Sequence, residues 1–154
     1  MSQSERPYEL HTNRELEFML ERGKPFAHFS DVYPADADEE TIPEEAFAPY
    51  VKKGIFEKRE FVVPEAPPPE HPHLRGTRHV LYARSNEAWR IDAWIMIITA
   101  AAKAGWNEGF ERLEGALLGY EEWQTDFHLE AMRNNPEARK LFFWLRKPSK
   151  PTEI

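Results

Sequence analysis

The sequence predicts an α+β fold, in which a small antiparallel sheet of about three strands packs against a C-terminal helical cluster. All five Trp residues follow residue 88, whereas most of the 13 Pro residues precede residue 73. A dense apolar segment, 93–102, lies after this Pro-rich region. Because proline interrupts regular structure and a dense apolar segment needs a buried environment, the contrast predicts a helical C-terminal core and a Pro-punctuated N-terminal half.

Length and composition predict one domain that spans residues 1–154. The formal charge of -7 argues against a broad nucleic-acid surface, since phosphate contacts require clustered Lys and Arg. The absence of Cys excludes disulfides, thiolate metal sites and Cys nucleophiles. The first residues are polar with no apolar leader, and segment 93–102 is far shorter than the roughly 20 residues that cross a bilayer. We therefore expect a cytoplasmic protein that binds neither membranes nor nucleic acids.

Turn and capping residues divide the N-terminal half into five elements. Thr12 and Glu15 have the spacing of a capping box, and Gly23 can supply a left-handed helix exit. Pro43 suits the first turn of a second helix that ends before Gly54. Runs of β-branched and aromatic residues predict the strands. The expected elements are a helix at 13–22, a short helix beginning at 41–44, and strands at 25–33, 55–63 and 78–84.

Residues 64–77 form a Pro-rich connection between the second and third strands. The connection is longer than the roughly 4–6 residues typical of compact domains, and its Pro run favours an extended conformation. We expect an exposed surface loop. His71 and His73 could present two rings to a metal ion, but a loop of this kind offers too few ligands for a zinc site.

The C-terminal half is predicted to form four helices. The central helix, 85–104, is apolar on nearly every side at its middle, so we expect it to be covered all round. Gly105 and Gly119 end two of the helices, and Pro136 suits the first turn of the last. Leu113 and Leu117 are expected to face inward. The remaining helices are predicted at 106–118, 121–133 and 136–145, followed by a loose tail at 147–154.

An acidic series along these helices is interpreted as solvated helix faces. A di-iron bundle would need Glu-x-x-His on two helices, and no Glu of this series is followed three positions later by His. We therefore predict no metal, no cofactor and no catalytic residue. The series comprises Glu108, Glu111, Glu114, Glu121, Glu122, Asp126, His128 and Glu130.

His28, Asp31 and His79 form a polar constellation if the first and third strands pair. His28 and Asp31 are three positions apart, so on a regular strand they face opposite sides of the sheet. No nucleophile elbow surrounds Ser30 or Ser85. We therefore favour structural polar residues on a half-solvated sheet over a catalytic dyad or triad.

Trp89 and Arg90 lie beside the apolar segment, at the start of the central helix. Glu87 and Arg90 have the spacing of an i,i+3 ion pair, which favours an exposed first turn. The alternative is a pocket rim at which the indole and guanidinium bind a planar or anionic group. In that alternative the ligand-binding residues are Trp89, Arg90, His28 and His79.

Phe142, Phe143 and Trp144 are adjacent, so together they cover more than one face of a helix. The core can bury one stripe, and the rest predicts an apolar patch that binds a protein partner or a second copy in a homodimer. The sequence therefore favours a non-enzymatic protein-interaction module. The alternative is a small enzyme or ligand-binding domain with a pocket between the sheet and the central helix.

Overall fold

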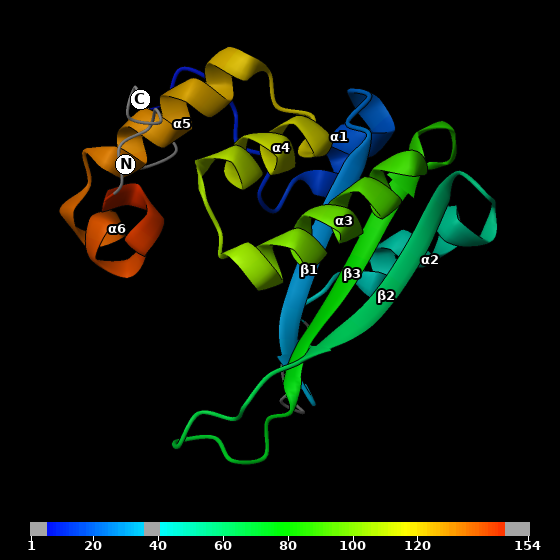
Figure 1. Cartoon of the computed structure of the whole chain (residues 1–154). Coiled ribbons are helices and arrows are strands. Elements are labelled where there is room, and N and C mark those ends of the chain that lie inside the picture. Colours follow the sequence, from blue (N-terminus) through cyan, green and yellow to red (C-terminus); the bar gives the residue numbers. More distant parts are fainter. Residues whose placement is uncertain (1–5, 36–40, 147–154) are drawn as a thin grey trace. The chain divides into compact units, whose positions relative to one another are not determined.

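The computed structural model describes residues 6–35 and 41–146 (Figure 1). Contacts between residues divide the chain into two compact units. The sheet unit comprises residues 14–91, and the helical unit combines the segment before residue 14 with the residues from 92 onward. The prediction of one domain over residues 1–154 stays a prediction, and the expected tail at 147–154 lies outside the described residues.

The sheet unit contains the three-stranded antiparallel sheet that the sequence predicts. Its strands are β1 (Phe26–Tyr33), β2 (Phe56–Pro64) and β3 (Gly76–Arg84), in the order β1-β3-β2. Ala27 of β1 and Lys58 of β2 both lie opposite Tyr82 of the central strand. Because opposite residues of an antiparallel pair share a face and faces alternate along a strand, this register puts His28 and His79 on the other face. The α+β class is confirmed.

The core of the sheet unit lies on the Tyr82 face of the sheet. Among the described residues of this unit, the α-helices that lie wholly within it are α1 (Glu15–Glu21) and α2 (Glu44–Lys52). Phe47 of α2 is fully buried and stacks on Tyr82, with ring centroids 4.1 Å apart. Met19 of α1, Phe56 of β2 and Val80 of β3 belong to the same cluster. Each such side chain stabilises the fold by about 1.5–3 kcal/mol relative to exposure, so this cluster fixes both helices on the sheet.

An ion-pair network joins the first turn of α2 to the edge of this core. Arg78 Nη2 lies 2.7 Å from Glu44 Oε1, and Lys58 Nζ lies 2.8 Å from the same oxygen. Glu60 contacts Arg78 from β2. Hydrogen bonds from Arg78 and then Lys58 lower the pKa of Glu44 to about 2. The carboxylate of Glu44 is therefore charged at neutral pH and pairs α2 with β2 and β3.

α1 begins later than the sequence predicts. Asn13 has a φ of 66°, which lies in the left-handed region and prevents a helix from starting there. Arg14 is the N-cap, and no side chain caps the helix, so the predicted Thr12–Glu15 capping box is not formed. The helix is consequently shorter at both ends than the predicted 13–22.

The described part of the C-terminal half contains the four predicted α-helices and two short 3-10 turns (Figure 1). They are α3 (Trp89–Ala104), α4 (Glu108–Leu118), α5 (Glu122–Arg133) and α6 (Pro136–Leu141), with η2 (Ser85–Glu87) before α3 and η3 (Phe143–Arg146) after α6. The last helix therefore ends earlier than the predicted 145. Phe142 takes an extended backbone, φ -113° and ψ 101°, which stops α6 and starts the turn.

Capping residues define the ends of α4 and α5. The side chain of Asn107 accepts a hydrogen bond from the Phe110 amide and so begins α4. Gly119, with φ 96°, ends the same helix in the left-handed conformation. Glu121 and Gln124 form a reciprocal capping box at the start of α5. This tight junction sets α4 and α5 side by side, and they share the most contacts of any helix pair described.

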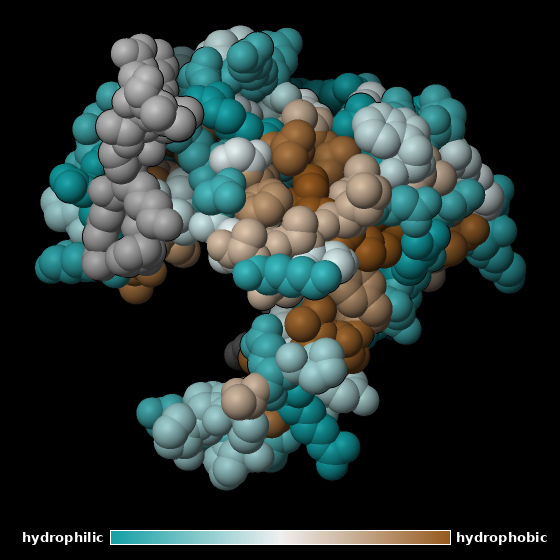
Figure 2. All heavy atoms as spheres, in the orientation of Figure 1, coloured by the Kyte–Doolittle hydropathy of each residue, from teal (hydrophilic) through white to brown (hydrophobic). Residues whose placement is uncertain are grey.

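The burial of two helices differs from the sequence prediction. Along α3, Ile91, Trp94 and Ile97 are buried at helical spacing, whereas Met96 is 72% exposed, so the helix is not covered all round. Figure 2 shows hydrophobic side chains at the surface where Figure 1 draws α3. Leu113 of α4 is 53% exposed rather than inward-facing. Within the described residues, no helix combines the length and apolar character that a bilayer span requires.

The Pro-rich connection spans residues 65–75 and projects beyond the sheet (Figure 1). Most of its residues are exposed, as the sequence predicts. Its two ends are fixed by backbone hydrogen bonds. The Arg75 amide donates to the Tyr33 carbonyl at 2.7 Å, and the Glu65 amide donates to the Arg75 carbonyl at 3.0 Å. The sheet thus continues one residue into the loop on either side.

Candidate functional site

The structure brings His28 and His79 together on the sheet. Their Nε2 and Nδ1 atoms lie 2.9 Å apart, and Phe61 of β2 stacks on the His79 ring. Burial lowers the pKa of His28 to about 3, with a smaller contribution from repulsion by His79 when that ring is protonated, and burial lowers the pKa of His79 as well. Both rings are therefore neutral at pH 7 and share one hydrogen bond. Asp31 lies opposite Arg78 and faces the other side of the sheet, as expected.

The structure also brings Trp89 and Arg90 together, at the first turn of α3. The Arg90 guanidinium lies 4.7 Å from the centroid of the Trp89 ring. Glu87 binds both side chains, accepting from Arg90 Nε at 2.9 Å and from Trp89 Nε1 at 3.0 Å. The predicted i,i+3 pair is therefore present. A ligand-binding role for Trp89, Arg90, His28 and His79 stays a prediction.

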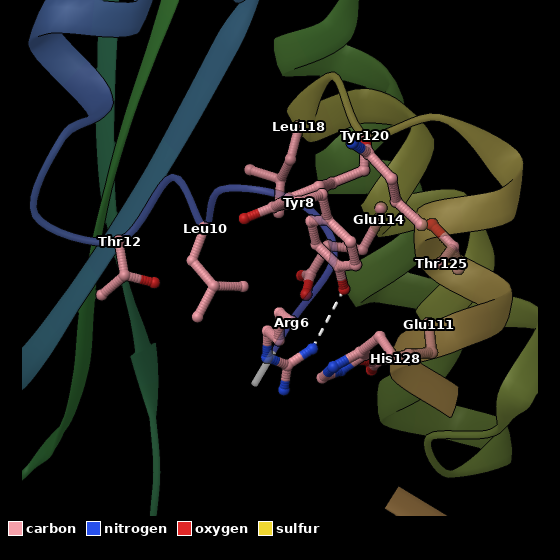
Figure 3. Close-up of a pocket in the computed structure, with 12 residues that line it drawn as sticks. Arg6, Tyr8, Leu10, Thr12, Glu111, Glu114, Leu118, Tyr120, Thr125 and His128 are labelled. Atoms are coloured by element: carbon pink, nitrogen blue, oxygen red, sulfur yellow. Dashed lines mark hydrogen bonds and ion pairs between the residues drawn. The ribbon is translucent and has the colours of Figure 1, made fainter. Parts of the chain in front are cut away.

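The helical unit holds a pocket between its N-terminal segment and the helices α4 and α5 (Figure 3). We call it the Tyr8 pocket, and its volume is about 240 Å³. Arg6 and His128 point toward each other across it, and the Arg6 guanidinium donates to the Tyr8 hydroxyl at 3.0 Å (Figure 3). The residues that line the polar side are Arg6, Tyr8, Glu111, Glu114, Tyr120, Gln124, Thr125 and His128.

Aromatic contacts fix the N-terminal segment against α5. The Tyr8 ring makes edge contacts with Trp123 and Phe127, at centroid distances of 5.5 and 5.9 Å. The His11 ring stacks on Tyr120 at 3.8 Å, and the His11 amide donates to the Tyr120 hydroxyl. Edge-to-face and stacked rings of this kind contribute about 0.5–1.5 kcal/mol each beyond their buried area. The segment therefore forms a fixed wall of the pocket.

Glu111 and Glu114 form the polar centre of the helical unit. They are three positions apart on α4, so they project from the same face. Burial opposes the ionisation of Glu111, but hydrogen bonds from His128 and Trp106 outweigh it and lower its pKa. Burial raises the pKa of Glu114, against the hydrogen bond from Trp94. The surroundings of the two carboxyl groups therefore change their pKa values in opposite directions.

The donors to these carboxyl groups come from three other parts of the unit. Trp106 Nε1 donates to Glu111 Oε2 at 2.8 Å, and Trp94 Nε1 donates to Glu114 Oε2 at 3.1 Å. His128 Nε2 lies 3.4 Å from Glu111 Oε1. Because indole N–H groups only donate, both tryptophans fix the orientation of the carboxyl groups they bind.

A second hollow shares Glu111 and Glu114 with the Tyr8 pocket. We call it the Trp106 hollow; its volume is about 420 Å³. It is lined by Trp106, Glu111, Glu114, Met132, Leu141, Phe142 and Trp144. Leu141 is 75% exposed and Phe142 is 42% exposed, whereas Trp144 is partly buried and its ring lies 6.1 Å from that of Phe142. Of the predicted interaction residues Phe142, Phe143 and Trp144, two therefore line a hollow; the Phe143 side chain lies outside the described part.

The sequence interpretation of Glu111 and Glu114 as solvated was wrong. Both side chains are partly buried and bonded to indole groups. Their spacing from Leu118 could have indicated this burial, since residues 111, 114 and 118 share one face of α4. Arg112, on another face, pairs with Glu108 and Asp126, which fits the solvated interpretation for that part of the series. Within the described residues, no group of three or more His, Asp or Glu side chains is placed to hold a metal ion.

Comparisons with known proteins leave the site to be interpreted from its own chemistry. No protein-family model, no curated protein sequence and no solved structure matches this chain.

Proposed function

We propose that this protein is a non-enzymatic interaction module, and that its helical unit binds a protein partner in the Trp106 hollow. The observation that carries the proposal is the exposure of Leu141 and Phe142 at the rim of a concave surface. Large apolar side chains gathered at a hollow are typical of sites that another molecule covers. The sequence independently predicts an interaction surface at Phe142, Phe143 and Trp144, of which Phe142 and Trp144 line this hollow.

Charge favours a basic partner over a second copy of this chain. A two-fold dimer places the same patch of each copy face to face. The Trp106 hollow contains Glu111, whose lowered pKa favours its charged form, so such a dimer would bring like charges together, which costs affinity. The chain as a whole carries a formal charge of -7, which adds to this repulsion.

A matched pair of variants tests the proposal. Phe142→Glu places a charge at the rim, whereas Leu113→Glu places the same charge at an exposed position of α4 outside the hollow. A partner that binds the wild-type protein and Leu113→Glu is identified by mass spectrometry, and its binding is confirmed by calorimetry with the purified protein. We expect this partner to bind Phe142→Glu at least tenfold more weakly. Equal binding to all three proteins would show that the hollow is not the interface.

Light scattering distinguishes a separate partner from a second copy. Our proposal expects the wild-type protein to have the mass of one chain at micromolar concentration. If the wild-type protein is instead a dimer that Phe142→Glu disrupts and Leu113→Glu leaves intact, the hollow is the interface of a homodimer. A homodimer is one of the two alternatives that the sequence predicts.

A second candidate function is an enzyme that uses Glu114 as a proton donor and Glu111 as a base. The specific observation that favours it is the opposite direction of their pKa changes, a common property of acid–base pairs. Turnover of chromogenic glycosides or esters that Glu114→Gln abolishes, with binding of the same compounds retained, would favour this candidate. The pocket predicted from sequence between the sheet and the central helix stays a prediction.

A further inference from the structure

We propose that the Trp106 hollow recognises the alkylammonium group of a lysine side chain on the partner protein, an inference that rests on the proposed function. The hollow combines aromatic rings from three residues with two carboxyl groups. Neither a purely apolar segment nor an anionic group matches that combination.

The rings of Trp106, Phe142 and Trp144 give the hollow three aromatic walls. Aromatic faces carry partial negative charge and attract ammonium groups within about 6 Å of the ring centroid, most strongly at Trp. The Phe142 and Trp144 rings are tilted by 43° to each other. Because all three rings line one hollow, an alkyl chain with a charged end that enters it meets aromatic side chains.

Glu111 and Glu114 add a carboxylate side to these aromatic walls. No Lys or Arg is found among the described residues that line the hollow, so this part of the lining supplies no ammonium or guanidinium group to the two carboxyl groups. Glu111 accepts hydrogen bonds from Trp106 and His128, and a carboxylate has about four acceptor positions. Capacity therefore remains for the N–H groups of an ammonium ion.

The apolar rim favours a lysine within a protein over a free amine. Leu141 and Phe142 line the same hollow as the two carboxyl groups and are exposed, whereas Glu111 and Glu114 are partly buried. A small amine would contact the carboxylates and leave this rim exposed. A peptide covers the rim with its neighbouring side chains while the four-carbon stem of its lysine crosses the apolar walls.

Indole N–H signals in ¹H–¹⁵N NMR spectra report binding directly. Trp106 and Trp94 donate to Glu111 and Glu114, whereas Trp123 and Trp89 donate to glutamates outside the hollow and serve as internal references. The probes are the peptide acetyl-Gly-Leu-Lys-Leu-Gly-amide, the same peptide with norleucine in place of lysine, and n-butylammonium. Each is titrated into the full-length protein.

We expect the lysine peptide to shift the Trp106 signal saturably and to bind about tenfold more tightly than the norleucine peptide, the preference that one charge-assisted contact supplies. Glu111→Gln should abolish this preference, whereas the exposed Glu122→Gln, which removes the same charge, should retain it. Glu114→Gln provides a second variant if Glu111→Gln does not fold.

Three other outcomes overturn the inference in distinguishable ways. Equal affinity for the lysine and norleucine peptides would leave the hollow as an apolar docking site and reject the ammonium group. Equal affinity for n-butylammonium and the lysine peptide would reject a partner protein as the source of the amine. No shift of Trp106 with any probe would reject both this inference and the proposed use of the hollow.

Discussion

Among single residues, Glu111 and Glu114 show how strongly local surroundings act on identical side chains. They lie about one turn apart on the same helix face. Burial opposes the ionisation of both carboxyl groups, but at Glu111 the hydrogen bonds from His128 and Trp106 outweigh it, whereas at Glu114 the bond from Trp94 does not, and the charge of Glu111 adds to the effect of burial. The pKa of the first therefore falls and that of the second rises.

Substitution by Gln should expose this difference in the pH dependence of stability. A carboxyl whose pKa is raised on folding contributes stability below its unfolded pKa and loses it as pH rises through the folded pKa. Glu114→Gln should therefore gain stability relative to wild type as pH rises above about 4. For Glu111 the sign reverses and the window lies lower, because a lowered pKa contributes stability that is fully present above the unfolded value of about 4 and is lost as pH falls below it. Glu111→Gln should therefore lose stability relative to wild type as pH rises toward about 4. Urea unfolding between about pH 2.5 and 7 measures both, and parallel pH profiles would contradict the prediction.

Lys24 is a second residue whose burial has a measurable consequence. It is only 5% exposed, and burial lowers its pKa to about 7. A depressed pKa contributes stability above the unfolded value, which is lost as pH falls through the folded value. Lys24→Met should therefore be more stable than wild type at pH 7, by about 1–3 kcal/mol, with a difference that narrows toward about pH 10.

Thermal or urea unfolding at pH 7 and pH 10 checks the Lys24 prediction. The control is Lys103→Met, which removes an exposed lysine near the end of α3. A stability gain at Lys103 as large as that at Lys24 would show that the effect comes from net charge rather than from burial.

Among elements, the α4–α5 pair determines the geometry of the Tyr8 pocket, and Gly115 determines how closely these helices approach. A Cβ atom at Gly115 would lie 2.7 Å from Thr125 Oγ1. Thr125 is buried, so its side chain has little room to move away. Glycine is otherwise unfavourable within a helix, by about 1 kcal/mol relative to Ala.

Gly115→Ala should destabilise the protein by about 1–2 kcal/mol despite the better helix propensity of Ala, because the clash forces α4 and α5 apart. Introduced into a Thr125→Ala background, the same substitution should instead be neutral or stabilising. A double-mutant cycle by urea unfolding measures this coupling. A stabilising Gly115→Ala in the wild-type background would mean that Thr125 rotates without cost.

For the molecule as a whole, the exposed loop at 65–75 adds length without adding to either core. Its ends are fixed by the Arg75 amide and the Glu65 amide, so the sheet does not depend on the residues between them. Loop closure changes by only about 0.6 kcal/mol for each doubling of length. The stability of the fold should therefore come from the sheet core and the helices.

Replacing residues 66–74 with a short Gly/Ser linker should change the Tm by less than about 3 °C. Arg75→Pro is the matched contrast, because it removes the amide that donates to the Tyr33 carbonyl and should lower the Tm further. Calorimetry measures both variants. Loss of cooperative unfolding in the linker variant would show that the loop packs into the structure.

The sequence by itself determined the fold class and the order of the elements. Alternating and helical periodicities are local, and so are the glycines and capping residues that end each helix, such as Asn107 and Gly119. The sequence also predicted that His28 and His79 could lie together if the first and third strands pair, because side chains alternate between the two faces of a strand. Boundaries shifted where backbone conformation, at Asn13 and Phe142, opposed the side-chain signal.

Only the tertiary structure decided which helix faces are buried and which side chains from other elements contact them. The spacing of Glu111 and Glu114 shows that they share a face, but not that indole groups from Trp94 and Trp106 bind them. The N-terminal segment contacts Tyr120, in the connection between α4 and α5, through Tyr8 and His11, which lie more than a hundred positions away in the sequence. Such contacts depend on packing volume and hydrogen-bond geometry across the whole chain, which no local pattern records. The candidate site is built from these contacts and so became visible only in three dimensions.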